Sequence, residues 1–275
     1  MKRLLVVLSL VPALAFAGET KTPTPKVPPA APGVDWAAKT IKATGRGAPA
    51  LNAPSVAAAR IGAEKAAELD ALRNILAVLK GIQITSERTV GDAMGGSDDL
   101  RAKLEGEAKA FKRVGTRYYN DGGVEIDVEM SIADLYTEVV PPPPPPSAEP
   151  AKAAEAPKLP ANGEPTNTGL VVDASKLKAK PALAPRLVDE AGKEVYSSTV
   201  VATEALKTNG IAGYLKSVDE AKKSARVGAK PLIIKALRVQ GASDLVIANA
   251  DADKLRDPKG NVAYLGEGRV IIVSE

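Results

Sequence analysis

The sequence of 275 residues contains neither histidine nor cysteine. Without histidine, the chain lacks the side chain whose unperturbed pKa lies near neutrality, and with it the commonest general base and metal ligand. Without cysteine, it has no thiolate nucleophile, no thiolate metal site, no disulfide bond and no acceptor for a lipid anchor. We therefore expect no enzyme activity, no cofactor and no metal site, although paired carboxylates or a Ser–Lys couple remain an alternative route to catalysis.

Aromatic side chains and excess charge are also scarce. Aromatic residues make up 3% of the chain, so its cores must be built from Ala, Val, Leu and Ile. Hydrophobic and charged residues make up 45% and 25%, as in ordinary globular domains. The formal net charge of +4 falls by two if Lys2 and Arg3 are removed with an export signal. So small a net charge gives no electrostatic footprint for nucleic acid, so we expect no nucleic-acid partner.

The first 17 residues have the pattern of a cleavable export signal. The basic residues Lys2 and Arg3 precede the apolar run 4–14, and Ala15-Phe16-Ala17 forms a small-x-small cleavage site. The apolar run is shorter than the roughly 20 residues that span a bilayer, and no later segment is long and apolar enough. We expect a periplasmic protein of a bacterial envelope, either soluble or peripherally attached.

Proline-rich segments divide the rest of the chain. Residues 18–33 form a leader, and residues 141–166 form a spacer that begins with six consecutive prolines. Such a run favours the polyproline II conformation and cannot bury a core. Fully extended, the spacer would reach about 80 Å at roughly 3.1 Å per residue. It separates residues 34–140 from residues 167–275, and each region has the size of a domain.

The first region predicts the element order β-α-β-α-β-β. Its long helix runs from about Pro54 to Gly81, and alanine in its first half would let it lie very close to a sheet. The apolar face is predicted to contain Ala59, Ala63, Ala66, Leu69, Leu72, Ile75, Leu76 and Leu79. The other predicted elements are strands at 40–46 and 82–90, a glycine-rich turn at 91–99, a helix at 100–111 and a hairpin of strands 112–119 and 124–132. Alternating apolar and acidic residues from Val124 to Met130 predict a last strand with one buried face.

The second region has the same class. We predict strands at 169–173, 232–239, 244–248 and 269–273, a hairpin at 186–196, and helices near 203–207, 218–225 and 251–255. The predicted fold is therefore α+β, with two small domains that each pack helices on a mixed or antiparallel-rich sheet and are joined by a proline-rich spacer.

Two motifs suggest catalysis without supplying its context. Ser175 and Lys178 match the Ser-x-x-Lys pattern of acyl-transfer enzymes, but they follow a strand rather than begin a buried helix, and the accompanying motifs are missing. Asp173 and Asp189 could serve as a glycosidase pair, but both lie beside strand ends, where turn and capping roles are common.

Binding motifs are equally incomplete. Asn249, Asp251 and Asp253 resemble the start of a calcium loop, but the glycine and glutamate that should follow are missing, so we expect them to cap a helix. The glycine-rich segments 91–96 and 266–268 lack the spacing of a phosphate loop.

The candidate binding residues are aromatic. Trp36, Tyr118 and Tyr119 would form a platform for stacking sugars if the fold brought them together, and otherwise they belong to the core or to a sheet face.

The block from Ala59 to Leu76, followed by Gly81-Ile82, resembles the helix of the Lpp-twenty-type surface lipoproteins. It is also similar to the N-terminal domain of flagellar assembly protein T, and Trp36 and the closing hairpin fit the same pattern. The resemblance implies a non-enzymatic envelope protein, with a place in the rings around a flagellar motor as one possibility. Because the chain has no lipobox cysteine, it would differ from the lipoproteins in having no lipid anchor.

These observations predict a periplasmic interaction or scaffold protein. Its partners would be envelope proteins or cell-wall components, and its oligomeric state is left open. The alternative is a module that binds peptidoglycan or another carbohydrate.

Overall fold

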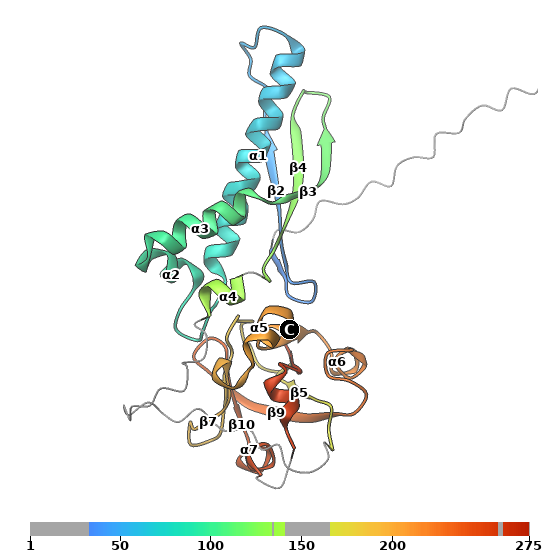
Figure 1. Ribbon diagram of the computed structural model, residues 1–275. Coiled ribbons are helices and arrows are strands. Elements are labelled where there is room, and N and C mark those ends of the chain that lie inside the picture. Colours follow the sequence, from blue (N-terminus) through green and yellow to red (C-terminus); the bar gives the residue numbers. More distant parts are fainter. Residues whose placement is uncertain (1–32, 134, 141–165, 258–260, 275) are drawn as a thin grey trace, which may run out of the picture.

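The computed structural model describes residues 33–133, 135–140, 166–257 and 261–274 (Figure 1). The predicted signal peptide and nearly all of the predicted leader and spacer lie outside these residues. The described chain is an α+β fold with two sheets, which confirms the predicted class. We call residues 33–140 the first unit and residues 166–274 the second unit. No helix in the described ranges combines the length and apolar character that crossing a membrane requires.

The first unit is a four-stranded antiparallel sheet in the order β1-β2-β4-β3, with α1 packed along one face. The structure confirms the predicted long helix, the helix before the hairpin and the hairpin itself. The elements are β1 (Gly33–Asp35), β2 (Thr40–Gly47), α1 (Val56–Gly81), α2 (Val90–Gly96), α3 (Asp98–Lys109), β3 (Lys112–Tyr118), β4 (Val124–Ser131) and α4 (Leu135–Val139).

The face that α1 buries differs from the predicted one. Ala66 and Leu69 are exposed, so their assignment to the core was wrong, and Ala59 is only half-buried. The prediction followed a stripe through Leu69 and Leu72, whereas the sheet buries residues at intervals of four, and the first three of these are alanines. The residues that α1 buries are Ala63, Ala67, Ala71, Ile75 and Leu79.

Glycines on β2 explain this choice. A Cβ atom added to Gly45 would lie 2.1 Å from the carbonyl oxygen of Ala67 and 2.2 Å from the backbone nitrogen of Ala71. A Cβ atom on Gly47 would lie 1.9 Å from the carbonyl oxygen of Ala63. The helix and strand backbones therefore touch directly, which only glycine on the strand permits. This contact confirms the prediction that alanines let the helix lie close to a sheet.

Two predictions between α1 and α3 were wrong. Residues 82–90 form no extended strand and make only isolated bridges, from Gln83 to Thr89 and to Ala182. The predicted glycine-rich turn is the helix α2, which begins with a capping box. The Thr89 hydroxyl accepts a hydrogen bond from the Asp92 amide at 3.1 Å, and the Asp92 carboxylate accepts one from the Thr89 amide at 2.8 Å. These paired caps stabilise the first turn despite the glycines.

The second unit is a mixed seven-stranded sheet in the order β7-β6-β10-β9-β5-β11-β8. All of its predicted strands and helices are present, and β8 and α8 are additions that the sequence did not suggest. The larger core covers one face of this sheet, and a smaller cluster that includes Val171 and Ala221 lies under α6 on the other. The elements are β5 (Gly169–Asp173), β6 (Leu187–Val188), β7 (Glu194–Tyr196), α5 (Thr203–Asn209), β8 (Gly213–Leu215), α6 (Val218–Lys223), β9 (Pro231–Gln240), β10 (Asp244–Ile247), α7 (Asn249–Arg256), α8 (Ala263–Gly266) and β11 (Val270–Val273).

The two units contact each other directly along a seam. The backbone after α1 accepts hydrogen bonds from the second unit, from Leu183 N to Gln83 O at 2.9 Å and from Ala184 N to Ile84 O at 2.7 Å. The Ser86 hydroxyl accepts a further bond from the Asp244 amide at 2.8 Å. Buried side chains of both units form one continuous hydrophobic cluster. We use "seam" for the contact between the units. It comprises residues 82–89 after α1, the β1–β2 turn and α4, together with the parts of the second unit that they touch.

Candidate functional site

The face of the first sheet opposite α1 contains two buried carboxylates. Glu125 and Asp127 of β4 are only 4% and 3% exposed. The alternating sequence predicted that one face of this strand would be solvated, and that prediction was wrong. Neighbouring side chains cover the acidic residues, so both faces of β4 are buried.

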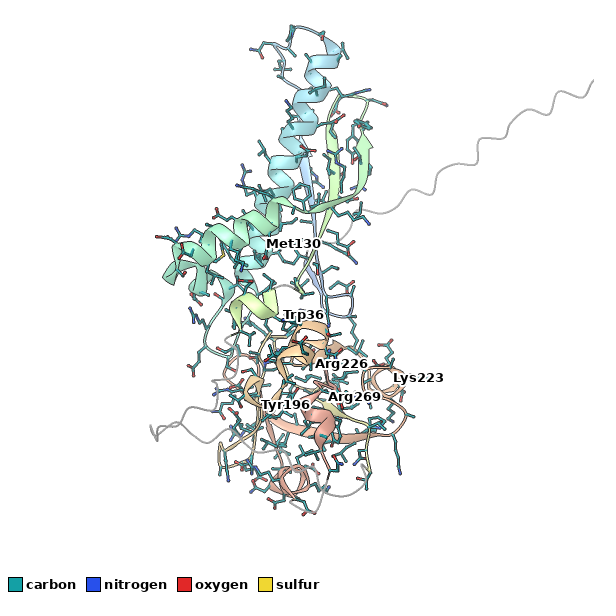
Figure 2. The ribbon with its side chains drawn as sticks, viewed as in Figure 1. Trp36, Met130, Tyr196, Lys223, Arg226 and Arg269 are labelled. Carbon is teal, nitrogen blue, oxygen red and sulfur yellow. The ribbon has the colours of Figure 1, made fainter. Side chains whose placement is uncertain are left out.

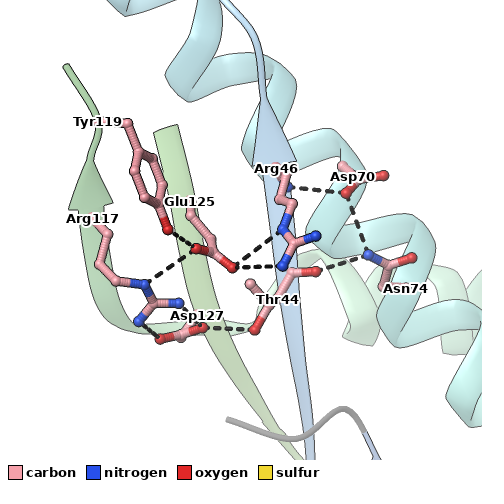
Figure 3. A network of polar contacts seen from close by, with 8 residues as sticks. All are labelled: Thr44, Arg46, Asp70, Asn74, Arg117, Tyr119, Glu125 and Asp127. Carbon is pink, nitrogen blue, oxygen red and sulfur yellow. Dashed lines mark hydrogen bonds and ion pairs between the residues drawn. The ribbon is translucent and has the colours of Figure 1, made fainter. Parts of the chain in front are cut away.

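Asp127 is held mainly by an arginine of the adjacent strand β3. Arg117 Nη2 donates to Asp127 Oδ1 at 2.8 Å, and the Thr44 hydroxyl of β2 donates to the same oxygen at 2.6 Å (Figure 3). The hydrogen bonds from Arg117 lower the pKa of Asp127 below its ordinary value, because they stabilise the ionised form.

Glu125 is bound by three side chains from β2, β3 and the hairpin turn. Arg117 Nε and Arg46 Nε each lie 3.3 Å from its carboxylate oxygens, and the Tyr119 hydroxyl donates a third bond. The bond from Tyr119 is the largest of the effects that lower the pKa of Glu125. Both carboxylates are therefore ionised at neutral pH. The network therefore satisfies both buried charges and joins β2, β3 and β4.

Side chains of α1 close the free edge of β2 beyond the short strand β1. Asn74 Nδ2 donates to the Thr44 carbonyl at 2.8 Å, and the Asp70 carboxylate accepts from the Arg46 amide at 3.0 Å. Backbone groups that would otherwise be available to an added strand are therefore occupied (Figure 3).

The first unit extends away from the second as an arm formed by α1 and the β3–β4 hairpin (Figure 1). We use "arm end" for the loop 48–55, the first turns of α1 and the hairpin residues 118–123. Tyr118 and Tyr119 are 52% and 48% exposed there. The Arg60 guanidinium lies 5.3 Å from the centre of the Tyr118 ring, and the Tyr118 hydroxyl donates to Glu64 at 2.9 Å. Leu51 in the loop and Val56 at the start of α1 are also exposed.

Trp36 lies at the opposite end of the sheet, at the seam (Figure 2). Its ring meets that of Tyr214 edge to face, with centroids 5.2 Å apart and planes inclined by 62°. It is separated from Tyr118 and Tyr119 by most of the length of β2, about 24 Å at 3.4 Å per residue. The three candidate aromatic residues therefore do not form one platform. Two of them lie at the arm end, and the third belongs to the contact between units.

The two catalytic alternatives have structural roles. The Ser175 hydroxyl donates to Asp173 at 2.6 Å and is not paired with Lys178. Asp189 accepts from the Lys193 amide at 2.8 Å and from Arg256 at 2.7 Å. These bonds confirm the turn and capping roles predicted for the two aspartates.

The segment that resembles a calcium loop belongs to α7. Asn249 accepts a hydrogen bond from the Glu190 amide at 3.3 Å, and Asp251 pairs with Lys254 at 2.7 Å. Throughout the described part of the chain, no group of three or more Asp or Glu side chains is placed to hold a metal ion.

Sequence reasoning missed the cations of the arm and the seam. Arg46, Arg60 and Arg117 contact the residues at and near the arm end, and Lys39 and Arg226 meet across the seam. The alternating acidic residues of β4 could have pointed to Arg117, because carboxylates that become buried need cationic side chains next to them. No comparable signal marked Lys39 or Arg226, which are 187 positions apart in the sequence.

Comparison with known families links the second unit to one described domain. A family model for the second domain of Treponema pallidum Tp0624 matches residues 169–275, which begin at the first residue of β5. The match covers the second unit and leaves the first unit, with its arm, unmatched. No curated protein matches the chain.

Proposed function

We propose that this protein is a non-enzymatic interaction or scaffold protein of the bacterial periplasm, and that it contacts an envelope protein through the arm end. The supporting observation is the composition of that surface. Tyr118, Tyr119 and Arg60 are residue types that dominate binding energy at protein interfaces. Arg60 lies over the Tyr118 ring on the α1 side of the hairpin, Tyr119 is exposed on its other side, and Leu51 and Val56 are exposed in the loop and first turn of α1.

The shape of the first unit supports the same proposal. A helix of 26 residues is about 39 Å long, and the arm that contains it projects from the second unit. The direct backbone contact between α1 and β2 and the charged network on the other face make the arm rigid. A rigid support presents side chains to a partner with little loss of conformational entropy.

Site-specific photo-crosslinking in the native bacterium tests this proposal. A photoreactive residue at position 118 should give a discrete adduct with an envelope protein, and the same residue at the exposed position 253 on α7 should not. Tyr119→Ala and Arg60→Ala in the crosslinking chain should each reduce the adduct by at least fivefold. Equal labelling from both positions, or no adduct from position 118, would refute the arm end as the contact surface.

Carbohydrate binding is the second candidate function, and it is favoured by the two exposed tyrosines. With Trp36 at the seam, stacking on a sugar would depend on Tyr118 and Tyr119 alone. Sedimentation with purified peptidoglycan separates the two proposals. Co-sedimentation that is abolished by the Tyr118→Ala/Tyr119→Ala double substitution would support the carbohydrate reading, and complete recovery in the supernatant would eliminate it.

The flagellar version of the proposal rests on the resemblance of residues 59–76 to flagellar and surface-lipoprotein families. A deletion strain provides its test. Reduced swimming with otherwise normal growth, restored by the wild-type gene and not by the Tyr118→Ala/Tyr119→Ala variant, is the expected result. Normal motility in the deletion strain would remove the flagellar version and leave the general envelope role.

A further inference from the structure

A cavity of about 230 Å³ lies between the two units at the seam. Trp36 and Lys39 of the β1–β2 turn form one side. Tyr214, Leu215, Arg226 and Ile271 of the second unit line the other. The walls therefore combine apolar and aromatic surface with two cationic side chains, and each unit contributes one of the cations.

The two cations converge on the end of α5. Lys39 Nζ donates to the carbonyl oxygens of Thr208 at 3.0 Å and Asn209 at 2.9 Å. Arg226 donates to the same Asn209 oxygen at 2.5 Å and to that of Gly210 at 3.1 Å. One carbonyl oxygen is thus shared by two positive charges, one from each side of the seam (Figure 2 shows Arg226 below Trp36).

The carbonyl groups at the end of α5 balance only part of this charge. A helix C-terminus is equivalent to roughly half a negative charge, whereas the two side chains bring two positive charges. Among the described residues, neither Lys39 nor Arg226 forms an ion pair with a carboxylate. The buried Nε of Arg226 has no hydrogen-bond partner. Burial, and then the charge of Arg226, lower the pKa of Lys39.

The tyrosines around Arg226 do not supply the missing negative charge. Burial raises the pKa of Tyr136 to about 12 and also raises the pKa values of Tyr196 and Tyr214. The hydroxyl groups of Tyr196 and Tyr214 donate to backbone carbonyls at 2.6 and 2.8 Å, which requires their protons. All three side chains are therefore neutral at physiological pH.

The backbone of Lys39 adds an independent observation. Its φ angle is 55°, and it is the only residue other than glycine with a positive φ in the described ranges. A non-glycine residue held in this region costs conformational energy, and such residues cluster at functional sites and in tight turns. Here the unusual conformation accompanies an ammonium group that crosses the seam to the end of α5.

We infer that the seam cavity binds a small organic carboxylate. The carboxylate would lie between Lys39 and Arg226 and neutralise their excess charge, with the planar guanidinium suited to its two oxygens. The apolar remainder of the ligand would pack against Trp36, Leu215 and Ile271. This apolar lining favours an organic carboxylate over a fully hydrated inorganic anion such as sulfate or phosphate.

The chain contains a single tryptophan, and it lies in the cavity wall, so its fluorescence reports directly on occupancy. We would titrate the full-length mature protein with butyrate at constant ionic strength and follow the Trp36 emission. Butyramide, which has a similar shape and no charge, is the matched ligand control. Butyrate should give a saturable change, and butyramide should bind at least tenfold more weakly.

Substitutions identify the cations responsible. Lys39→Gln should weaken butyrate binding at least tenfold, whereas Lys42→Gln, on the neighbouring strand and paired with Asp35, should leave it unchanged. Circular dichroism of Lys39→Gln should match the wild-type spectrum, which separates loss of binding from loss of folding. Equal responses to butyrate and butyramide, unchanged binding in Lys39→Gln, or tighter binding of sulfate or phosphate than of butyrate would each overturn the inference.

Discussion

The two faces of the first sheet are built in opposite ways from the same strands. Toward α1, β2 presents Gly45 and Gly47, and the backbones meet without intervening side chains. On the other face, the same strands bury ionised Glu125 and Asp127 beneath arginine and tyrosine side chains. The glycines on the first face determine how closely α1 can approach the sheet. On the second face, which no helix covers, paired charged side chains shield the strands from solvent. Removing side-chain volume and pairing charges are thus two solutions to covering one sheet.

Replacing Gly45 by alanine should have the largest effect. The added methyl group would lie 2.1 Å from a backbone oxygen of α1, and the backbone of a helix cannot move aside as a side chain can. We expect a loss of about 4 kcal/mol or more in the free energy of unfolding, measured by urea denaturation.

Gly62→Ala is the control for this prediction, because Gly62 lies within α1 and has no atom within 4 Å of the added methyl position. This change should stabilise the protein by about 1 kcal/mol through helix propensity. If Gly45→Ala were tolerated equally well, the direct backbone contact would be refuted.

Arg117→Met should cost about 3 kcal/mol at pH 7, because it leaves two buried carboxylates without their shared cation. The folded pKa values of Asp127 and Glu125 lie below the ordinary values of 3.8 and 4.5. Their contribution is therefore present above these ordinary values and is lost as the pH falls through the folded values. The stability difference between wild type and variant should shrink on going from pH 7 to pH 3.

Arg46→Met provides the matched comparison for the charged face. Arg46 also contacts Glu125, but its side chain is 78% exposed, so solvent screens the pair. We expect a loss below about 1 kcal/mol. Equal losses for the two arginine variants, or a difference that does not change with pH, would contradict the account of the network.

Asn74→Ala tests the free edge of β2, which lies between the two faces of the sheet. It removes the bond to the Thr44 carbonyl on the free edge of β2, and we expect a loss of about 1 kcal/mol. Arg73→Ala, one position earlier and 78% exposed, should change the unfolding midpoint little. If both variants changed stability equally little, water would replace the hydrogen bond from Asn74 to the Thr44 carbonyl without loss of stability.

Leu69→Ala should have the smallest effect, within about 0.5 kcal/mol, because Leu69 is 65% exposed on the side of α1 away from the sheet. Ile75→Ala, at a fully buried position of the same helix, should cost about 3 kcal/mol. Thermal unfolding of both variants compares the observed face of the helix with the predicted one, and a large loss for Leu69→Ala would restore the predicted face.

The sequence predicted most of the elements because their signals are local. The alternation in β4, the turn before it and the limits of α1 all follow from residues close together in the chain. The buried face of α1 did not, because Ala67 and Ala71 give a weak hydrophobic signal and were chosen by Gly45 on a distant strand. Likewise, α2 was missed because its glycines outweighed the capping signal of Thr89 and Asp92.

The candidate surfaces were predicted only in part. Tyr118 and Tyr119 both lie at the arm end, but their side chains point to opposite faces of the hairpin, toward Glu64 of α1 and toward Glu125, as consecutive strand residues do. Trp36 was grouped with them by residue type alone, and strand direction takes it to the other end of the sheet. The seam depends on pairs such as Ser86 and Asp244, which are 158 positions apart, and no local pattern specifies such a pair.

The continuous cluster of buried side chains across the seam changes the meaning of the proline-rich segment. A covalent tether is essential only when the parts it joins would otherwise drift apart. Here each half supplies the surface that the other needs for its interior. The chain can thus be regarded as two complementary fragments. If the spacer were cut, the two fragments should stay together as a non-covalent heterodimer, because each needs the other to bury its interior.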